Sequence, residues 1–112
     1  MKSRVVEKYN AVIIELKGDV MGGDDTKEFN ELLHKLIDEG KKNIIVDLGE
    51  VKFMNSSGLG MLISALTTAK KAEGNLKLAR VGEKIQSLLI ITKLIQIFET
   101  FESVDDAVKS YS

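Results

Sequence analysis

The chain has 112 residues and a formal net charge of −1, from 16 Lys and Arg against 17 Asp and Glu. The absence of cysteine and the single histidine, His34, exclude disulfides, thiol chemistry and Cys- or His-rich metal sites. The balanced charge creates no field that attracts nucleic acid, and no apolar run approaches the roughly 20 residues that span a bilayer. We therefore expect one cytoplasmic domain over residues 1–112, without cofactors and without nucleic-acid or membrane partners.

The first part of the chain predicts a hairpin followed by a helix. An apolar run at residues 11–17 predicts a strand, with which residues 4–8 pair through a turn at Tyr9-Asn10. After a glycine-containing loop, Asp25 is expected to cap a helix that Gly40 closes. The apolar residues of that helix follow helical spacing: Phe29, Leu32, Leu33, Leu36 and Ile37.

The rest of the chain alternates strands and helices. Residues 43–48 predict a strand buried on both faces, and a helix is expected from Ser56 or Ser57 to Gly74. Residues 76–79 predict a short strand, and Gly82 opens a third helix. The apolar stretch at residues 94–98 predicts a further short strand, and Ser103 caps a last helix. This order predicts an α/β fold in which about four helices cover a mixed, mainly parallel sheet of four to five strands.

Motifs of common enzymes are missing. There is no G-x-x-x-x-G-K-[ST] loop for nucleotide phosphates and no G-x-S-x-G turn for a nucleophilic serine. His34 lies on the flank of a predicted helix, where it is more simply a surface residue than a general base. We therefore expect a protein that is not an enzyme.

The most informative segment is residues 47–62, where a buried strand leads through a loop to the paired serines Ser56 and Ser57. The start of a helix carries free N–H groups and favours an anion, so a phosphate on a serine is tolerated there. Gly58 and Gly60 are poor helix formers, which suggests that something approaches the backbone closely. The alternative is a simple capped helix whose glycines pack on the sheet.

This segment resembles the signature of STAS domains, specifically the bacterial anti-sigma factor antagonists, whose pattern is D-L-[SG]-x-V-x-[FY]-[ML]-[DN]-S-[ST]-G-L-[GA]. The matching residues are Asp47, Leu48, Val51, Phe53, Met54, Ser56, Ser57, Gly58, Leu59 and Gly60. Asn55 stands where many phosphorylated members carry Asp. Lys93 stands where the family often has Gly, so we expect a more helical turn at that point.

The resemblance implies a regulated binding module. Such proteins bind an anti-sigma factor serine kinase when unphosphorylated, and are switched off by phosphorylation, here at Ser57, which a serine/threonine phosphatase reverses. The expected partner-binding residues are Met21, Gly22, Gly23, Asp24, Asn55, Ser56, Ser57, Gly58, Leu59 and Met61. Met54, Leu59 and Met61 are candidates for an exposed apolar patch. Core packing is the alternative for Leu59, and Met61 has the strongest claim to exposure.

Two other functions remain open within the same fold. One is a STAS adaptor that is never phosphorylated, in a signalling or lipid-transport assembly. The other is a small-ligand or nucleotide-binding domain with a pocket near Asp47 and Ser57. The expected state of association is a monomer or a weak dimer.

Overall fold

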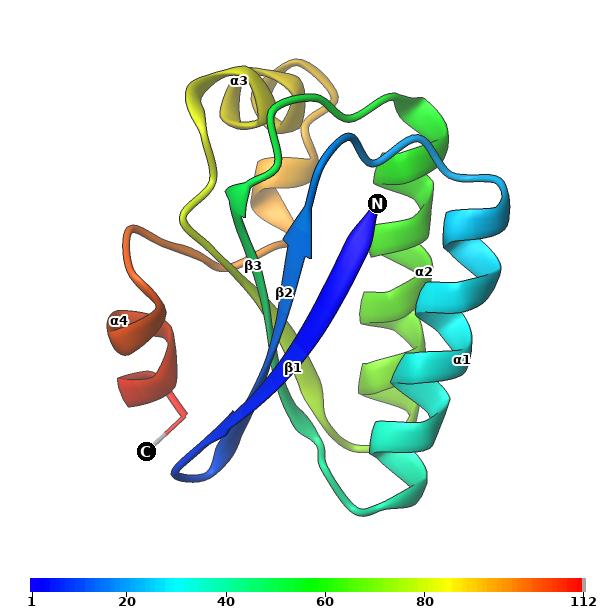
Figure 1. Cartoon of the computed structure of the whole chain (residues 1–112). Helices are drawn as coiled ribbons and strands as arrows, with labels where there is room; N and C mark the ends of the chain where they lie inside the picture. The colour runs from blue at the N-terminus through cyan, green and yellow to red at the C-terminus, as the bar shows by residue number, and fades with distance from the viewer. Residues whose placement is uncertain (112) are drawn as a thin grey trace.

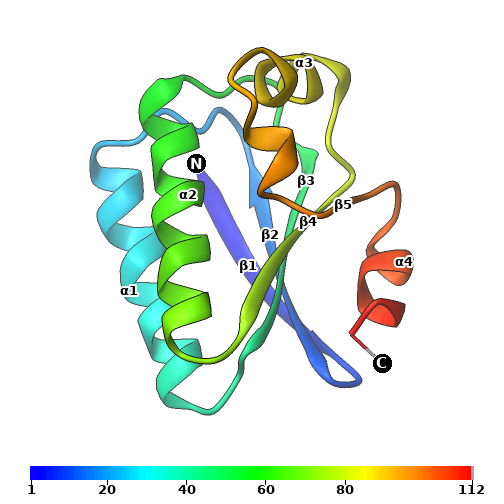
Figure 2. The same cartoon turned by 180° about the vertical axis from the view of Figure 1, so that it is seen from behind.

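A computed structural model, which describes residues 1–111, has a single five-stranded sheet with helices on both faces (Figures 1 and 2). The strands lie in chain order: β1 (Lys2–Lys8), β2 (Ala11–Lys17), β3 (Asn43–Glu50), β4 (Asn75–Ala79) and β5 (Thr100–Phe101). The first pair is antiparallel and the other three pairs are parallel. The prediction of a mixed, mainly parallel sheet is therefore confirmed.

The helices divide unequally between the two faces of the sheet. Helices α1 (Asp24–Asp38) and α2 (Ser56–Lys71) lie side by side on one face, and α4 (Val104–Lys109) lies on the other. Helix α3 (Glu83–Ile91) sits beyond the carboxyl end of the sheet, and the 3-10 turn η1 (Leu94–Gln96) leads back from it. Between α1 and α2 on one side and α4 on the other, β3 is covered on both faces.

The buried run in β3 follows from this layering. All five residues from Ile44 to Leu48 are buried. Ile44, Val46 and Leu48 belong to the main core under α1 and α2, whereas Ile45 belongs to a smaller core under α4. Successive side chains of a strand point to opposite faces, so a strand with two covered faces needs apolar residues at consecutive positions.

Helix α4 is anchored by a buried lysine and a tyrosine. The Nζ of Lys77 donates to Ser110 Oγ at 2.9 Å and lies 4.2 Å from the centroid of the Tyr111 ring. The Tyr111 hydroxyl donates to the carbonyl oxygen of Ile44 at 2.8 Å. These contacts join the residues just after α4 to the start of β3 and the middle of β4.

Most predicted boundaries agree with the structure, but the predicted start of α1 does not. The hairpin turns at Tyr9, whose φ is 57°, and Gly40 has a φ of 83° after α1. Helix α1 begins at Asp24 after Gly23, which provides no side-chain cap. Asp25 lies inside the first turn and not at the cap position, so its predicted capping role is wrong.

Two expectations for the later turns are also wrong. Lys93 has a φ of 65°, a left-handed conformation that ends α3 instead of extending it. The residues after it form η1, and the short strand comes later, as β5.

Helix α2 ends at Lys71, before Gly74, with Glu73 in the left-handed region. The predicted cap at Ser103 is confirmed, since its Oγ accepts from Asp106 N at 3.0 Å.

Candidate partner-binding face at the start of α2

Two loops at the carboxyl end of the sheet are joined by backbone hydrogen bonds. One loop connects β2 to α1 and the other connects β3 to α2. Val20 N donates to Phe53 O at 3.0 Å, and Asn55 N donates to Val20 O at 3.3 Å. Gly18 N donates to Glu50 O at 3.1 Å. The two loops therefore act as one surface, next to the first turn of α2.

Asn55 caps α2. Its Oδ1 accepts a hydrogen bond from Gly58 N at 2.8 Å, and the helix begins at Ser56, as expected. Ser56 and Ser57 occupy the first two helical positions, and both are exposed. Their hydroxyls stand at the positive end of the helix dipole, where added negative charge is favoured.

Ser57 packs closely against Gly22 of the β2–α1 loop. Gly22 has a φ of +81°, and a Cβ built on it would lie 2.5 Å from Ser57 Cβ. Only glycine allows this approach, because any side chain would overlap Ser57 and would also be strained at this φ. Of the predicted loop residues, Gly22 is buried in this contact, whereas Met21, Gly23 and Asp24 are exposed beside it.

The two glycines of α2 have different surroundings. A Cβ on Gly58 would lie 2.2 Å from the carbonyl oxygen of Val20, so the expected close approach is present there and comes from the β2–α1 loop. A Cβ on Gly60 would meet nothing within 4 Å, and Gly60 is exposed. Packing in the described part of the chain therefore accounts for Gly58 but not for Gly60.

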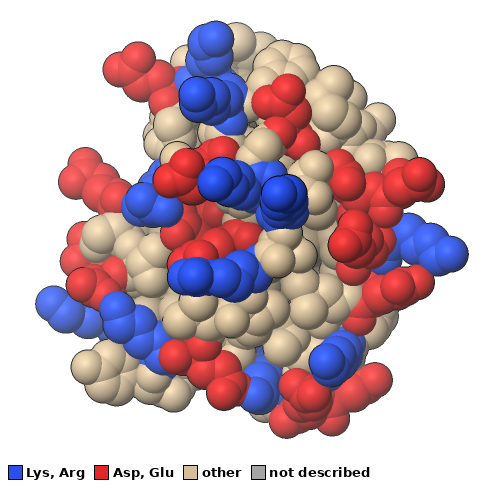
Figure 3. All heavy atoms as spheres, in the orientation of Figure 1, with Lys and Arg blue, Asp and Glu red and all other residues tan. Residues whose placement is uncertain are grey.

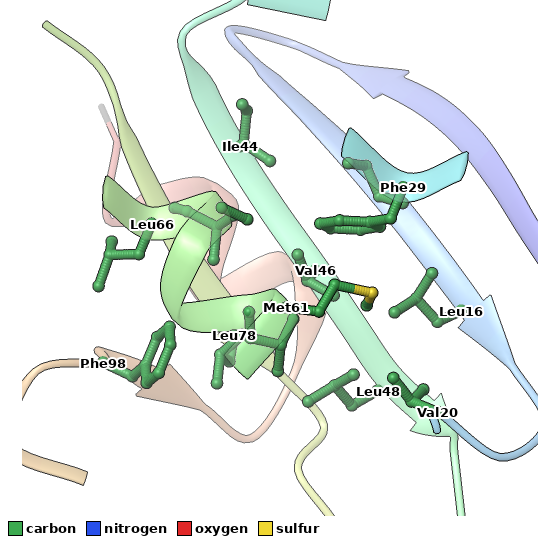
Figure 4. Close-up of a cluster of buried hydrophobic side chains, with 14 of the residues drawn as sticks. Leu16, Val20, Phe29, Ile44, Val46, Leu48, Met61, Leu66, Leu78 and Phe98 are labelled. Atoms are coloured by element: carbon green, nitrogen blue, oxygen red, sulfur yellow. The ribbon is translucent and has the colours of Figure 1, made fainter. Parts of the chain in front are cut away.

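The expected apolar patch of Met54, Leu59 and Met61 is not at the surface. The three residues are 4%, 4% and 1% exposed. Figure 4 shows Met61 directed into the core beside Phe29 and Val46. Helix α2 packs against both the sheet and α1, so it buries a wider arc than the single stripe expected from the sequence.

Two other apolar side chains near the start of α2, Met21 and Phe53, are exposed, at 45% and 48%. Each comes from one of the two joined loops. The sequence analysis did not expect Phe53 at the surface. In the structure its neighbour Met54 forms a β-bridge with Val20 and is buried. In extended backbone the neighbour of an inward residue points outward, which is the signal that identifies Phe53.

Neither charge nor metal ligands distinguish this surface further among the described residues. Figure 3 shows acidic and basic side chains interspersed, without a large area of one sign on the face in view. Within residues 1–111, no group of three or more His, Asp or Glu is arranged to hold a metal ion. No helix in the described part of the chain is long and apolar enough to cross a membrane.

Comparison with known proteins places this arrangement in a family. The model of the STAS domain matches residues 2–107. An anti-sigma-B factor antagonist of Staphylococcus epidermidis is 31% identical over 78 residues, which cover 70% of this chain and 72% of that protein.

Solved structures show the same fold. A Thermotoga maritima protein described as an anti-sigma factor antagonist has a TM-score of 0.83 at 19% identity, covering 97% of this chain and 92% of that one. The Bacillus cell fate determinant SpoIIAA in its phosphorylated form has a TM-score of 0.76 at 16% identity, covering 99% and 100%. With the family match over nearly the whole chain, the conclusion is that this protein belongs to the STAS domain family.

Proposed function

We propose that this chain is an anti-sigma factor antagonist whose Ser57 face binds an anti-sigma factor serine kinase. In this proposal the kinase phosphorylates Ser57, the complex dissociates, and a serine/threonine phosphatase restores binding. The observation that carries the proposal is the position of Ser57, exposed in the first turn of α2 and pressed against Gly22 of the neighbouring loop. The relatives named as anti-sigma factor antagonists support it.

A phosphate at Ser57 would affect a partner more than the fold. Phosphorylation adds about −1.5 to −2 charge, which the positive end of α2 accommodates. The same charge at the centre of a protein interface must lose its water and find an opposite charge, or it repels the partner. We therefore expect a local switch, with backbone NMR shifts of the phosphorylated protein confined to the residues around Ser57. Shift changes spread over the whole sheet would contradict this.

Gly60 gives the proposal a second support. A glycine inside a helix costs roughly 0.5–1 kcal/mol relative to alanine, and no neighbour in the described chain requires its missing side chain. Gly60 follows Ser57 by three residues, so the two lie on the same face of α2. A partner that reaches the helix backbone beside Ser57 explains why this position carries no side chain.

The direct test is affinity capture from the native lysate with matched baits. Wild-type protein and the Ser57→Asp variant are compared with Thr67→Asp, which places the same charge on an exposed position of α2 about 15 Å further along the helix. We expect wild type and Thr67→Asp to retain an anti-sigma factor of the kinase class, and Ser57→Asp to lose it.

Other outcomes of the capture separate the competing functions. If all three baits retain the same partners, Ser57 does not gate binding by charge, and the protein acts as an adaptor. If no bait retains a protein partner, a small-ligand function is favoured, which stabilisation of the folded state by added ligand would reveal.

A further inference from the structure

Arg80 has a backbone conformation that is unfavourable for its residue type. It directly follows β4 and has a φ of 54°, in the left-handed region that L side chains avoid. Its backbone N–H still donates to Phe101 O at 2.9 Å, so the position belongs to the ordered end of the sheet. Tyr9, Glu73 and Lys93 have similar φ values in turns, so the role of Arg80 follows from its side-chain contacts and not from its φ.

The side chain of Arg80 forms a two-pronged ion pair with Asp47. Nε lies 2.8 Å from Oδ1, and Nη2 lies 3.0 Å from Oδ2. Asp47 is only 3% exposed and ends the buried part of β3, whereas Arg80 is about half exposed. The hydrogen bonds that Arg80 donates to the Asp47 carboxylate raise the pKa of Arg80, so its guanidinium stays charged.

The ion pair also holds the end of β3, from which the β3–α2 loop leads to Ser57. Asp47 Oδ1 accepts a third hydrogen bond, from Gly49 N at 3.0 Å. The guanidinium of Arg80 lies directly over Gly49, where a Cβ would come within 2.2 Å of it. Gly49 does not have a positive φ, so its glycine is explained by the Arg80 side chain and not by the backbone.

The end of β3 and the loop that leads from it to Ser57 are thus held by two different sets of contacts. Laterally, Glu50 O and Phe53 O accept backbone hydrogen bonds from Gly18 and Val20, at the end of β2 and in the β2–α1 loop. On the α4 side the end of β3 is covered by Arg80, at Gly49. We propose that Arg80 is a positioning residue for the Ser57 face: it fixes the β3–α2 loop from behind without belonging to the partner-binding surface. The link to partner binding rests on the proposed function, whereas the positioning itself does not.

Amide hydrogen exchange of the free protein tests the positioning directly. The informative amides are those of Gly49, which bonds to Asp47, and of Gly18, which bonds to the carbonyl of Glu50 at the end of β3. Amides in the middle of α1 serve as the reference for global unfolding. In Arg80→Gly we expect exchange to accelerate roughly tenfold more at Gly18 and Gly49 than at the reference amides.

Two further variants separate the side chain from the backbone. Arg80→Ala also lacks the guanidinium, but it keeps the backbone strain at positive φ that Arg80→Gly relieves. The two variants should therefore differ in global stability, and both should show faster exchange at Gly18 and Gly49. Arg80→Lys retains a charge without the two-pronged geometry and should restore protection in part. Equal acceleration at every amide, or unchanged protection at Gly49 in Arg80→Gly, would overturn the proposal. Neither outcome depends on a partner, so a failure here is distinct from a failure of the capture with Ser57→Asp.

Discussion

The two glycines of α2 provide a matched pair for a quantitative test. Replacing either by alanine removes the conformational cost of a helical glycine, a gain of about 0.5–1 kcal/mol. At Gly60 nothing opposes that gain, because the new methyl meets no atom within 4 Å. At Gly58 the methyl would lie 2.2 Å from Val20 O and 2.9 Å from Val20 C, both backbone atoms that cannot turn away.

The expected effects on stability therefore have opposite signs. Overpacking costs about 1–3 kcal/mol, and contact with backbone places Gly58→Ala near the upper part of that range. After the helical gain is subtracted, Gly58→Ala should be destabilised by about 1–2 kcal/mol, whereas Gly60→Ala should be stabilised by about 0.5–1 kcal/mol.

Urea unfolding of the two variants against wild type measures the difference, with an unchanged m-value as the check that the denatured state is not affected. If Gly58→Ala proved as stable as Gly60→Ala, the close packing of α2 on the β2–α1 loop would be refuted. In the capture experiment Gly60→Ala should also retain less partner than wild type despite its greater stability, a combination that a purely structural glycine would not produce.

Three further results are expected. Asn55→Ala should lose about 0.5–2 kcal/mol of stability with the cap of α2, whereas Asn55→Asp should keep the cap and gain from the helix dipole; a similar Tm for both would contradict the capping role. Lys77→Met should lose about 1–2 kcal/mol because the charged contacts at the end of α4 disappear, whereas the exposed control Lys70→Met should stay within about 0.5 kcal/mol of wild type in the same urea unfolding assay. Burial raises the pKa of the Tyr111 phenol above its ordinary value of 10.0, so the neutral form is favoured in the folded state and its stabilising contribution is complete below about pH 10 and lost as the pH rises further. In a Tyr9→Phe background, phenolate absorbance should therefore appear together with the loss of helical circular dichroism, and ionisation without unfolding would contradict this.

Periodicity predicted the architecture because the spacing of apolar residues along each element follows the faces that the element buries. Strand β2 and the face of α1 with Phe29 and Leu33 are apolar where they touch the core and polar elsewhere. The consecutive apolar residues of β3 indicated two covered faces for the same reason. Local patterns of this kind depend on which side of an element is buried, and the sequence records that directly.

The details of the candidate site could be predicted only in part. The sequence located Ser57 and the loop with Gly22, but it assigned Met61 to the surface, because a single helical stripe does not show that α2 has two packing partners. Arg80 was not singled out, since its role depends on Asp47 and Gly49, which lie more than 30 positions earlier in the chain. A cap at Asn55 and a cap at Ser56 give the same local pattern, and backbone geometry decides between them.

The outer position of β1 has a consequence for self-association. A free strand edge can extend its sheet by pairing with the same edge of a second copy. A two-fold axis perpendicular to the sheet pairs two β1 strands antiparallel and keeps the same face of both sheets on the same side. Two residues that lie opposite each other must then both have even numbers or both have odd numbers. Pairing Val5 with Val5 then sets Lys2 against Lys8, and the adjacent registers set Arg4 against Arg4 or against Lys8. Like charges meet in each of these registers, so the sequence of β1 discourages growth of the sheet from molecule to molecule.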